Sequence, residues 1–194
     1  METLLKTKIR LAGSFLLITT LILPVARAQA GEGSSPFEPA PAGVRLSGIV
    51  ECGRGYTSHE LYDMKITLLE VKRGDEAWKQ LWEASPLNKP ADEGFEYILA
   101  RIRFEYYARV KPGLCVHKLS PGQFIACSSD GDEYPFADVA LPAPKMQADM
   151  KSGDTREGWI ALLAPKSDKT PLLYYTADAG RAVVHGGNIW FRLY

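Results

Sequence analysis

The chain has 194 residues, of which 46% are hydrophobic, and its 23 basic side chains are balanced by 23 acidic ones. This length suits one domain with a substantial core better than two domains. The neutral balance and the lack of any Lys/Arg-rich run argue against nucleic-acid binding, because basic side chains supply most of the affinity for phosphate backbones.

The first 30 residues have the pattern of an export signal. They begin with the basic residues Lys6, Lys8 and Arg10. An apolar run from Leu11 to Val25 follows, and then small residues that predict cleavage after Ala28 or Ala30. The run is shorter than the roughly 20 residues that span a bilayer. We therefore expect a signal peptide over residues 1–30 and no stable membrane span after its removal, with an uncleaved anchor as the alternative.

Export sets the expected compartment and the charge of the mature chain. Residues 1–30 hold four of the basic residues and one of the acidic ones, so the remainder has a net formal charge near −3. We expect a secreted or extracytoplasmic protein, in the periplasm or at the cell surface, that has no nucleic-acid partner.

The segment 31–43 is rich in Gly, Ser, Pro and Ala, which predicts a flexible tether before a domain over 44–194. Residues 44–51 are expected to form a first strand at a sheet edge. Residues 61–72 alternate between apolar and polar side chains and predict a second strand. The alternation shifts to Leu69 and Val71, which indicates a β-bulge or a part of the strand that is covered on both faces.

A short amphipathic helix is predicted near 75–85, ended by the prolines that follow Ser85. Its apolar side carries two alanines and Leu81, with Trp78 and Trp82 four residues apart beside them. A helix of about three turns is marginal alone in water. We therefore expect Trp78, Leu81 and Trp82 to pack against the neighbouring strands as structural residues.

A long strand is predicted over 96–107, where the alternation gives one apolar and one largely charged sheet face. A strand over 123–128 leads into an Asp130-Gly131 hairpin turn. The apolar run 158–164 predicts a central strand, with the structural residue Trp159 in or beside the core. Further strands are expected at 171–176 and 189–193. Connections are expected at 141–153, as a long loop, and at 178–187, as a turn-rich segment.

These elements predict a mainly β fold. Some seven to nine short strands with one helix near 75–85 fit an immunoglobulin-like β-sandwich. A small closed barrel is the alternative architecture.

The region around the helix also resembles a known family. Gly74, Ala77-Trp78, the prolines of 86–90 and Gly94-Phe95-Glu96-Tyr97, followed by the alternating strand, are similar to secreted bacterial immunoglobulin-like domains of unknown function. Some members of that family are labelled telomeric repeat-binding factors. The likeness spans about residues 44–194. It implies an extracellular β-sandwich and brings no catalytic residues with it.

Three cysteines enter an oxidising compartment, so one disulfide among Cys52, Cys115 and Cys127 is one interpretation, and three unbonded thiols are the other. A bond between Cys115 and Cys127 requires a bend, which Pro121-Gly122 could supply. Cys52 is at least as plausible a partner. The sequence leaves the pairing open.

No motif for catalysis, cofactor binding or a phosphate loop is present, and we predict no catalytic, cofactor-binding or metal-binding residues. Cys115-Val116-His117 is the one close Cys/His pair, with copper or zinc binding as the less favoured interpretation. Exposed aromatic side chains can form a binding surface. The candidates for a partly exposed patch are Tyr106, Tyr107, Tyr174, Tyr175 and Tyr194.

The sequence therefore favours a non-enzymatic extracellular or envelope module that binds an extracellular protein or an envelope polymer. The alternative is a small secreted hydrolase or a metal-handling protein. A pocket with convergent His, Asp or Cys side chains would favour the alternative.

Overall fold

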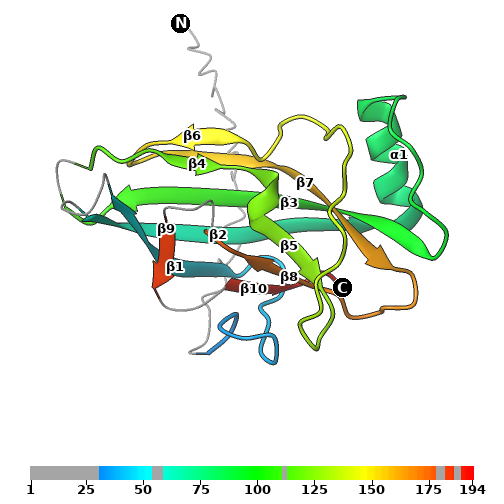
Figure 1. Cartoon of the computed structure of the whole chain (residues 1–194), viewed down its shortest axis with the longest axis horizontal. Helices are drawn as coiled ribbons and strands as arrows, with labels where there is room; N and C mark the ends of the chain where they lie inside the picture. Colours follow the sequence, from blue (N-terminus) through cyan, green and yellow to red (C-terminus); the bar gives the residue numbers. More distant parts are fainter. Residues whose placement is uncertain (1–30, 54–58, 111–112, 178–181, 186–188) are drawn as a thin grey trace, which may run out of the picture.

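The computed structural model describes residues 31–53, 59–110, 113–177, 182–185 and 189–194. The predicted signal peptide lies outside these ranges. The described chain is mainly β, with antiparallel sheets, one α-helix and a short 3-10 helix (Figure 1), which confirms the predicted fold class. The helices are α1 (Gly74–Ala84) and η1 (Pro121–Gln123). The strands are β1 (Arg45–Gly53), β2 (His59–Arg73), β3 (Phe95–Ala108), β4 (His117–Leu119), β5 (Phe124–Cys127), β6 (Ala148–Met150), β7 (Thr155–Pro165), β8 (Leu172–Tyr175), β9 (Ala182–His185) and β10 (Ile189–Arg192).

The strands form three antiparallel sheets. The largest has the order β7-β3-β2-β1-β9, the second has the order β10-β8-β5, and β4 pairs with β6 in a small third sheet. The described residues hold ten strands, more than the seven to nine predicted. Three of them, β4, β6 and β9, lie outside the predicted strand ranges and have only three or four residues each. β6 and β9 fall in the segments 141–153 and 178–187, which were expected to be connections.

The main core lies between the five-stranded and the three-stranded sheets. It combines side chains of β1, β2, β3 and β7 with those of β5, β8 and β10, so the arrangement is sandwich-like. On β3, the alternating residues point into this core as predicted. They are Ile98, Ala100, Ile102, Phe104 and Tyr106, and each is fully buried.

The strands β2 and β3 pair antiparallel over most of their length. The ladder between β2 and β3 shifts between Leu68 and Glu70, which confirms the bulge predicted near Leu69. Because the alternation restarts one residue later, Val71 packs against the same main core as Leu68.

Two strand positions differ from the prediction. β1 is not an edge strand, because it pairs with β2 on one side and β9 on the other. β7 is an edge of the five-stranded sheet and not a central strand. Its apolar run is buried because the preceding loop covers it: Trp159 N–H donates to Pro144 O at 2.8 Å, and Met146 N–H donates to Trp159 O at 3.1 Å. Gly158 permits this approach, since a Cβ there would lie 2.5 Å from the Lys145 carbonyl carbon.

Residues 31–43 do not form the free tether that their composition predicts. Ala40 is fully buried, and its N–H donates to Trp190 O at 2.9 Å while its carbonyl accepts from Arg192 N–H at 2.8 Å. Gly33 O also accepts from Trp190 N–H at 2.9 Å. The segment therefore satisfies the outer edge of β10, whose backbone groups would otherwise be unpaired.

Candidate functional site

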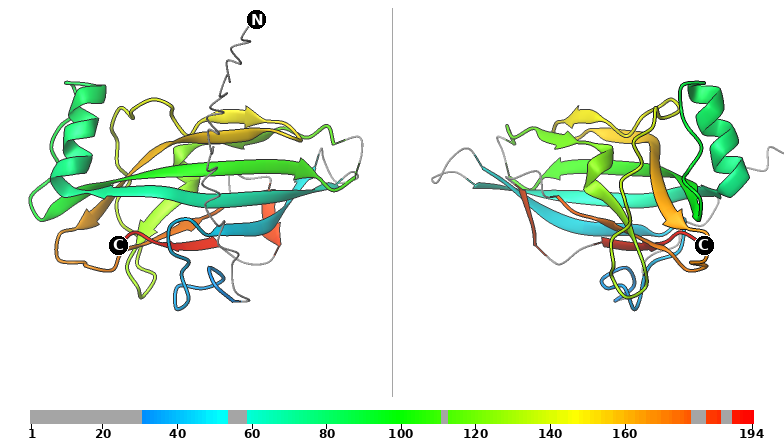
Figure 2. Two further views of the ribbon diagram at one scale, coloured as in Figure 1. Left: turned by 180° about the vertical axis from the view of Figure 1, so that it is seen from behind. Right: turned by 45° about the vertical axis from the view of Figure 1, so that its right-hand side comes forward.

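The helix α1 lies at one end of the five-stranded sheet and follows β2 without a connecting loop (Figures 1 and 2). It packs on the outer face of the sheet, opposite the main core. Ala77 and Leu81, one turn apart, are fully buried against Tyr97 and Leu99 of β3. Trp159 of β7 belongs to the same cluster and is 7% exposed. This second core holds the helix to the sheet.

The two helix tryptophans differ in burial. Trp78 is partly buried and stacks on Tyr97, with ring centroids 6.1 Å apart. Trp82 is 49% exposed, contrary to the expectation that it packs in the core. Ala77 and Leu81 form the buried stripe, and the tryptophans, each one position further along, lie beside it. The rings of Trp78 and Trp82 are 6.0 Å apart, so the exposed ring continues the aromatic surface of the buried one.

A hollow of about 140 Å³ opens beside Trp78 at the corner between β2, α1 and the start of β3. Trp78, Phe95, Tyr97 and Pro90 supply its apolar wall. We call this hollow, together with the adjoining Trp82, the α1 pocket.

The corner itself depends on a glycine and an ion pair. Gly74 has φ +57°, a left-handed conformation that lets β2 turn directly into the helix. A Cβ at this position would lie 3.0 Å from a carboxylate oxygen of Glu96. The Arg73 guanidinium donates to Glu96 at 2.5 Å and to Asp168 O at 3.0 Å. The Glu96 charge at the pocket is thus balanced by Arg73.

The polar side of the α1 pocket consists of Asp75, Glu96 and Lys166. The Asp75 and Lys166 side chains are exposed, and neither has a hydrogen-bond or ion-pair partner among the described residues. The carboxylates of Asp75 and Glu96 are matched by the cations of Lys166 and Arg73, so the pocket as a whole carries no net charge.

A buried asparagine anchors the loop that contributes Pro90 and Ala91 to the lining of the pocket. Asn88 is 7% exposed, and its amide donates to Leu81 O at 2.8 Å and to Ala140 O at 2.9 Å. Its carbonyl accepts from Ala140 N–H at 2.7 Å. Sequence reasoning missed Asn88, whose only signal is a polar residue between two prolines. These bonds tie the C-terminal end of α1 to a distant loop.

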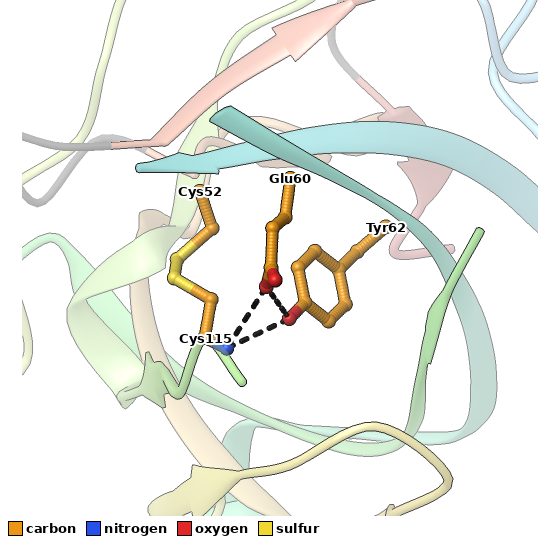
Figure 3. The surroundings of a disulfide bond; sticks show 4 residues. All are labelled: Cys52, Glu60, Tyr62 and Cys115. Atoms are coloured by element: carbon orange, nitrogen blue, oxygen red, sulfur yellow. Dashed lines mark hydrogen bonds between the residues drawn. A yellow bond between two sulfur atoms is a disulfide. The ribbon is translucent and has the colours of Figure 1, made fainter. Parts of the chain in front are cut away.

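The disulfide lies elsewhere in the molecule and joins Cys52 to Cys115, with Cα atoms 6.1 Å apart (Figure 3). Cys127 is a buried free thiol. Beside the disulfide, Cys115 N–H donates to the Tyr62 hydroxyl at 2.8 Å and to Glu60 at 3.1 Å. The Tyr62 hydroxyl donates to Glu60 at 2.5 Å, which lowers the pKa of the Glu60 carboxyl. Burial raises the pKa of Tyr62 to about 12. The disulfide fastens the end of β1 to the segment before β4.

His117 points into the main core and away from solvent. It is 5% exposed, its Nε2 lies 3.0 Å from the Tyr175 hydroxyl, and its ring stacks on Phe104. Burial lowers the pKa of His117 to about 4, so the ring is neutral at neutral pH. Because the Cys115 sulfur is bonded to Cys52, the Cys115-Val116-His117 segment offers no thiolate for a metal. Among the described residues, no three His, Cys, Asp or Glu side chains are grouped to hold a metal ion.

The tyrosines expected to share an exposed patch are separated. Tyr106 and Tyr175 are buried in the main core, and Tyr174 is 9% exposed and packs on Trp190 with centroids 4.9 Å apart. Tyr107 is partly buried, and Tyr194 is 59% exposed. The exposed aromatic surface that the structure does form, at α1, uses tryptophans that were expected in the core.

Two other hollows are larger. One of about 660 Å³ is lined by residues 108–110, 113–116, 151 and 152. Another of about 290 Å³ lies between β5 and β7 and is mainly apolar, with Phe136 62% exposed at its rim. The α1 pocket differs from it because aromatic rings there face side chains with unused hydrogen-bonding groups.

The described residues thus define a mainly β, sandwich-like domain with an aromatic pocket at one end of its large sheet. Comparison with protein-family models, curated proteins and solved structures gives no match for this chain. Within the described ranges, no helix is both long and apolar enough to cross a membrane.

Proposed function

We propose that this protein is a non-enzymatic binding module of the cell envelope or the exterior, and that it holds its ligand at the α1 pocket. The observation that carries the proposal is Trp82, a tryptophan with a 49% exposed side chain beside the Trp78 wall of a hollow. Tryptophan is enriched among the residues that dominate binding energies, because it offers a large rigid surface. A tryptophan needed only for the core would be expected to lie inside it.

Two observations support the extracytoplasmic location. Residues 1–30 have the basic, apolar and small-residue pattern of an export signal. The bond between Cys52 and Cys115 suits an oxidising compartment, since cytosolic thiols are normally kept reduced. The resemblance of residues 44–194 to secreted bacterial immunoglobulin-like domains, an expectation from the sequence, implies the same location. The expected partner is an extracellular protein or an envelope polymer.

Co-sedimentation of the purified protein with an envelope fraction from the producing cell tests this proposal. The wild type should sediment with the envelope, and Trp82→Ala should remain in solution. Phe37→Ala is the matched control, because Phe37 is an aromatic residue that is 88% exposed. Its segment, residues 31–43, hydrogen-bonds to β10 and lies away from α1 (Figure 2). Sedimentation of Trp82→Ala at the wild-type level, or of none of the three proteins, would overturn the proposal.

A further inference from the structure

We infer that the α1 pocket binds a neutral saccharide unit of a polymer, stacked on Trp78 and continuing over Trp82. This inference rests on the proposed function, since it names the chemical class of the ligand at the same site. Its grounds are the charge, the chemical composition and the size of the pocket.

Charge decides against an ionic ligand. Asp75 and Lys166 have opposite charges at the rim, and Glu96 is already paired with Arg73 at 2.5 Å. A cationic side chain attracted by Asp75 would also meet the Lys166 ammonium, and an anion attracted by Lys166 would meet the Asp75 carboxylate. Specificity follows from such repulsion as much as from attraction. A neutral ligand meets no such penalty.

Chemical composition favours a ligand with one apolar face and a polar rim. Trp78 and Phe95 supply aromatic and apolar surface, while Asp75 offers acceptors and Lys166 offers donors, none of them used within the described chain. A pyranose ring has this character, because its axial C–H groups form an apolar face and its hydroxyls, which both donate and accept, surround the edge. An aliphatic side chain of a protein partner would leave both charged groups desolvated without hydrogen bonds.

Size favours one ring in the hollow and further rings outside it. The volume of about 140 Å³ is well below the range of about 300 to 1,000 Å³ that encloses a whole drug-sized ligand. The Trp82 ring, 6.0 Å from the Trp78 ring and half exposed, provides the next stacking surface. A chain of linked sugars would contact both tryptophans, whereas a monosaccharide would contact one.

Titration with soluble oligosaccharides, followed by tryptophan fluorescence, tests the charge argument directly. The probes are the neutral tetramers of N-acetylglucosamine, glucose and mannose, the cationic glucosamine tetramer and the anionic galacturonic acid tetramer. At least one neutral tetramer should bind about tenfold more tightly than either charged tetramer and than its own monomer. Trp82→Ala should weaken that binding about tenfold, whereas Phe37→Ala should leave it unchanged. Trp82 is half exposed, so its replacement is expected to leave the protein folded.

Sedimentation with envelope material separates failure of this inference from failure of the proposed function. Hot detergent extraction and protease digestion leave envelope polymer without protein. Retention of the wild type on this polymer, with loss in Trp82→Ala, supports a saccharide ligand. Retention on intact envelope alone, or tighter binding of a charged tetramer, overturns the saccharide inference while leaving a binding module in place. No retention on either material overturns the proposed function itself.

Discussion

Acidification should destabilise this protein through His117. The ring is 5% exposed, lies 3.0 Å from the Tyr175 hydroxyl and stacks on Phe104, and burial lowers its pKa to about 4 from the ordinary value of 6.5. Between these two values the unfolded chain binds a proton that the folded chain does not. The free energy of unfolding therefore falls as the pH drops below the unfolded value, and this loss levels off below the folded value.

The size of the effect follows from the two pKa values. Linkage gives about 2 kcal/mol lost between about pH 7 and pH 5, and about 3 kcal/mol for the whole shift. This is a large part of a domain stability of about 5 to 15 kcal/mol. Glu60 and Glu157, whose carboxyl pKa values are lowered by hydrogen bonds from Tyr62 and Arg103, are expected to stay charged in this range. These two carboxylates should therefore add little to the change in the free energy of unfolding between about pH 7 and pH 5.

Urea denaturation at about pH 7 and pH 5 measures this difference, which should be about 2 kcal/mol larger in the wild type than in His117→Gln. Glutamine does not titrate and keeps an acceptor near Tyr175. Tyr175→Phe is the control, because it removes the hydroxyl but keeps the buried ring of His117. It should be less stable than the wild type and still depend on pH. Equal pH dependence in the wild type and His117→Gln would refute the reasoning.

Four further outcomes are expected. Asn88→Ala removes three hydrogen bonds of a buried side chain and should lower the free energy of unfolding by at least about 2 kcal/mol in urea denaturation, and an unchanged midpoint would contradict its role at the end of α1. Replacing Cys52 and Cys115 together by Ala removes a disulfide across a sequence separation of 63 residues and should lower the free energy of unfolding by about 4 kcal/mol. Urea denaturation of the double variant, and of the wild type with and without reductant, measures this loss. Equal stability would contradict the stabilising role of the disulfide. Mass spectrometry of the exported protein should show cleavage after residue 28 or 30, whereas detection of Met1 would contradict it. Titration with duplex and single-stranded DNA should show no submicromolar binding, and tight binding with a steep salt dependence would contradict the charge argument.

Local patterns in the sequence were sufficient for the elements whose causes are local. The alternation from Ile98 to Tyr106 predicted which side chains of β3 enter the core, and burial of each of them agrees. The helix begins at Gly74 and ends at Ala84, within a residue of the prediction, because a glycine corner and a following proline limit it. The mainly β fold class follows from the same period-two alternation.

Other features depended on segments that meet only in the folded chain. The apolar run of β7 resembles that of a central strand, but a loop covers its outer edge, and composition alone cannot distinguish these two kinds of burial. Residues 31–43 have the composition of a tether and instead satisfy the open edge of β10. In both cases the decisive partner is distant in sequence.

The candidate site also combines features that depend on neighbours along the chain with features that depend on distant segments. A helical pattern predicts an apolar side, but two tryptophans next to the buried stripe can each turn toward the sheet or toward solvent, and the packing of Leu81 on Leu99 leaves Trp82 outside. Cys52 could be joined to Cys115 only when β1 and the segment before β4 were placed side by side. The sequence by itself determined the elements and their apolar faces, because these depend on neighbours along the chain. The tertiary structure alone decided the pocket, the Asn88 bonds and the disulfide, because each needs distant groups within a few ångströms.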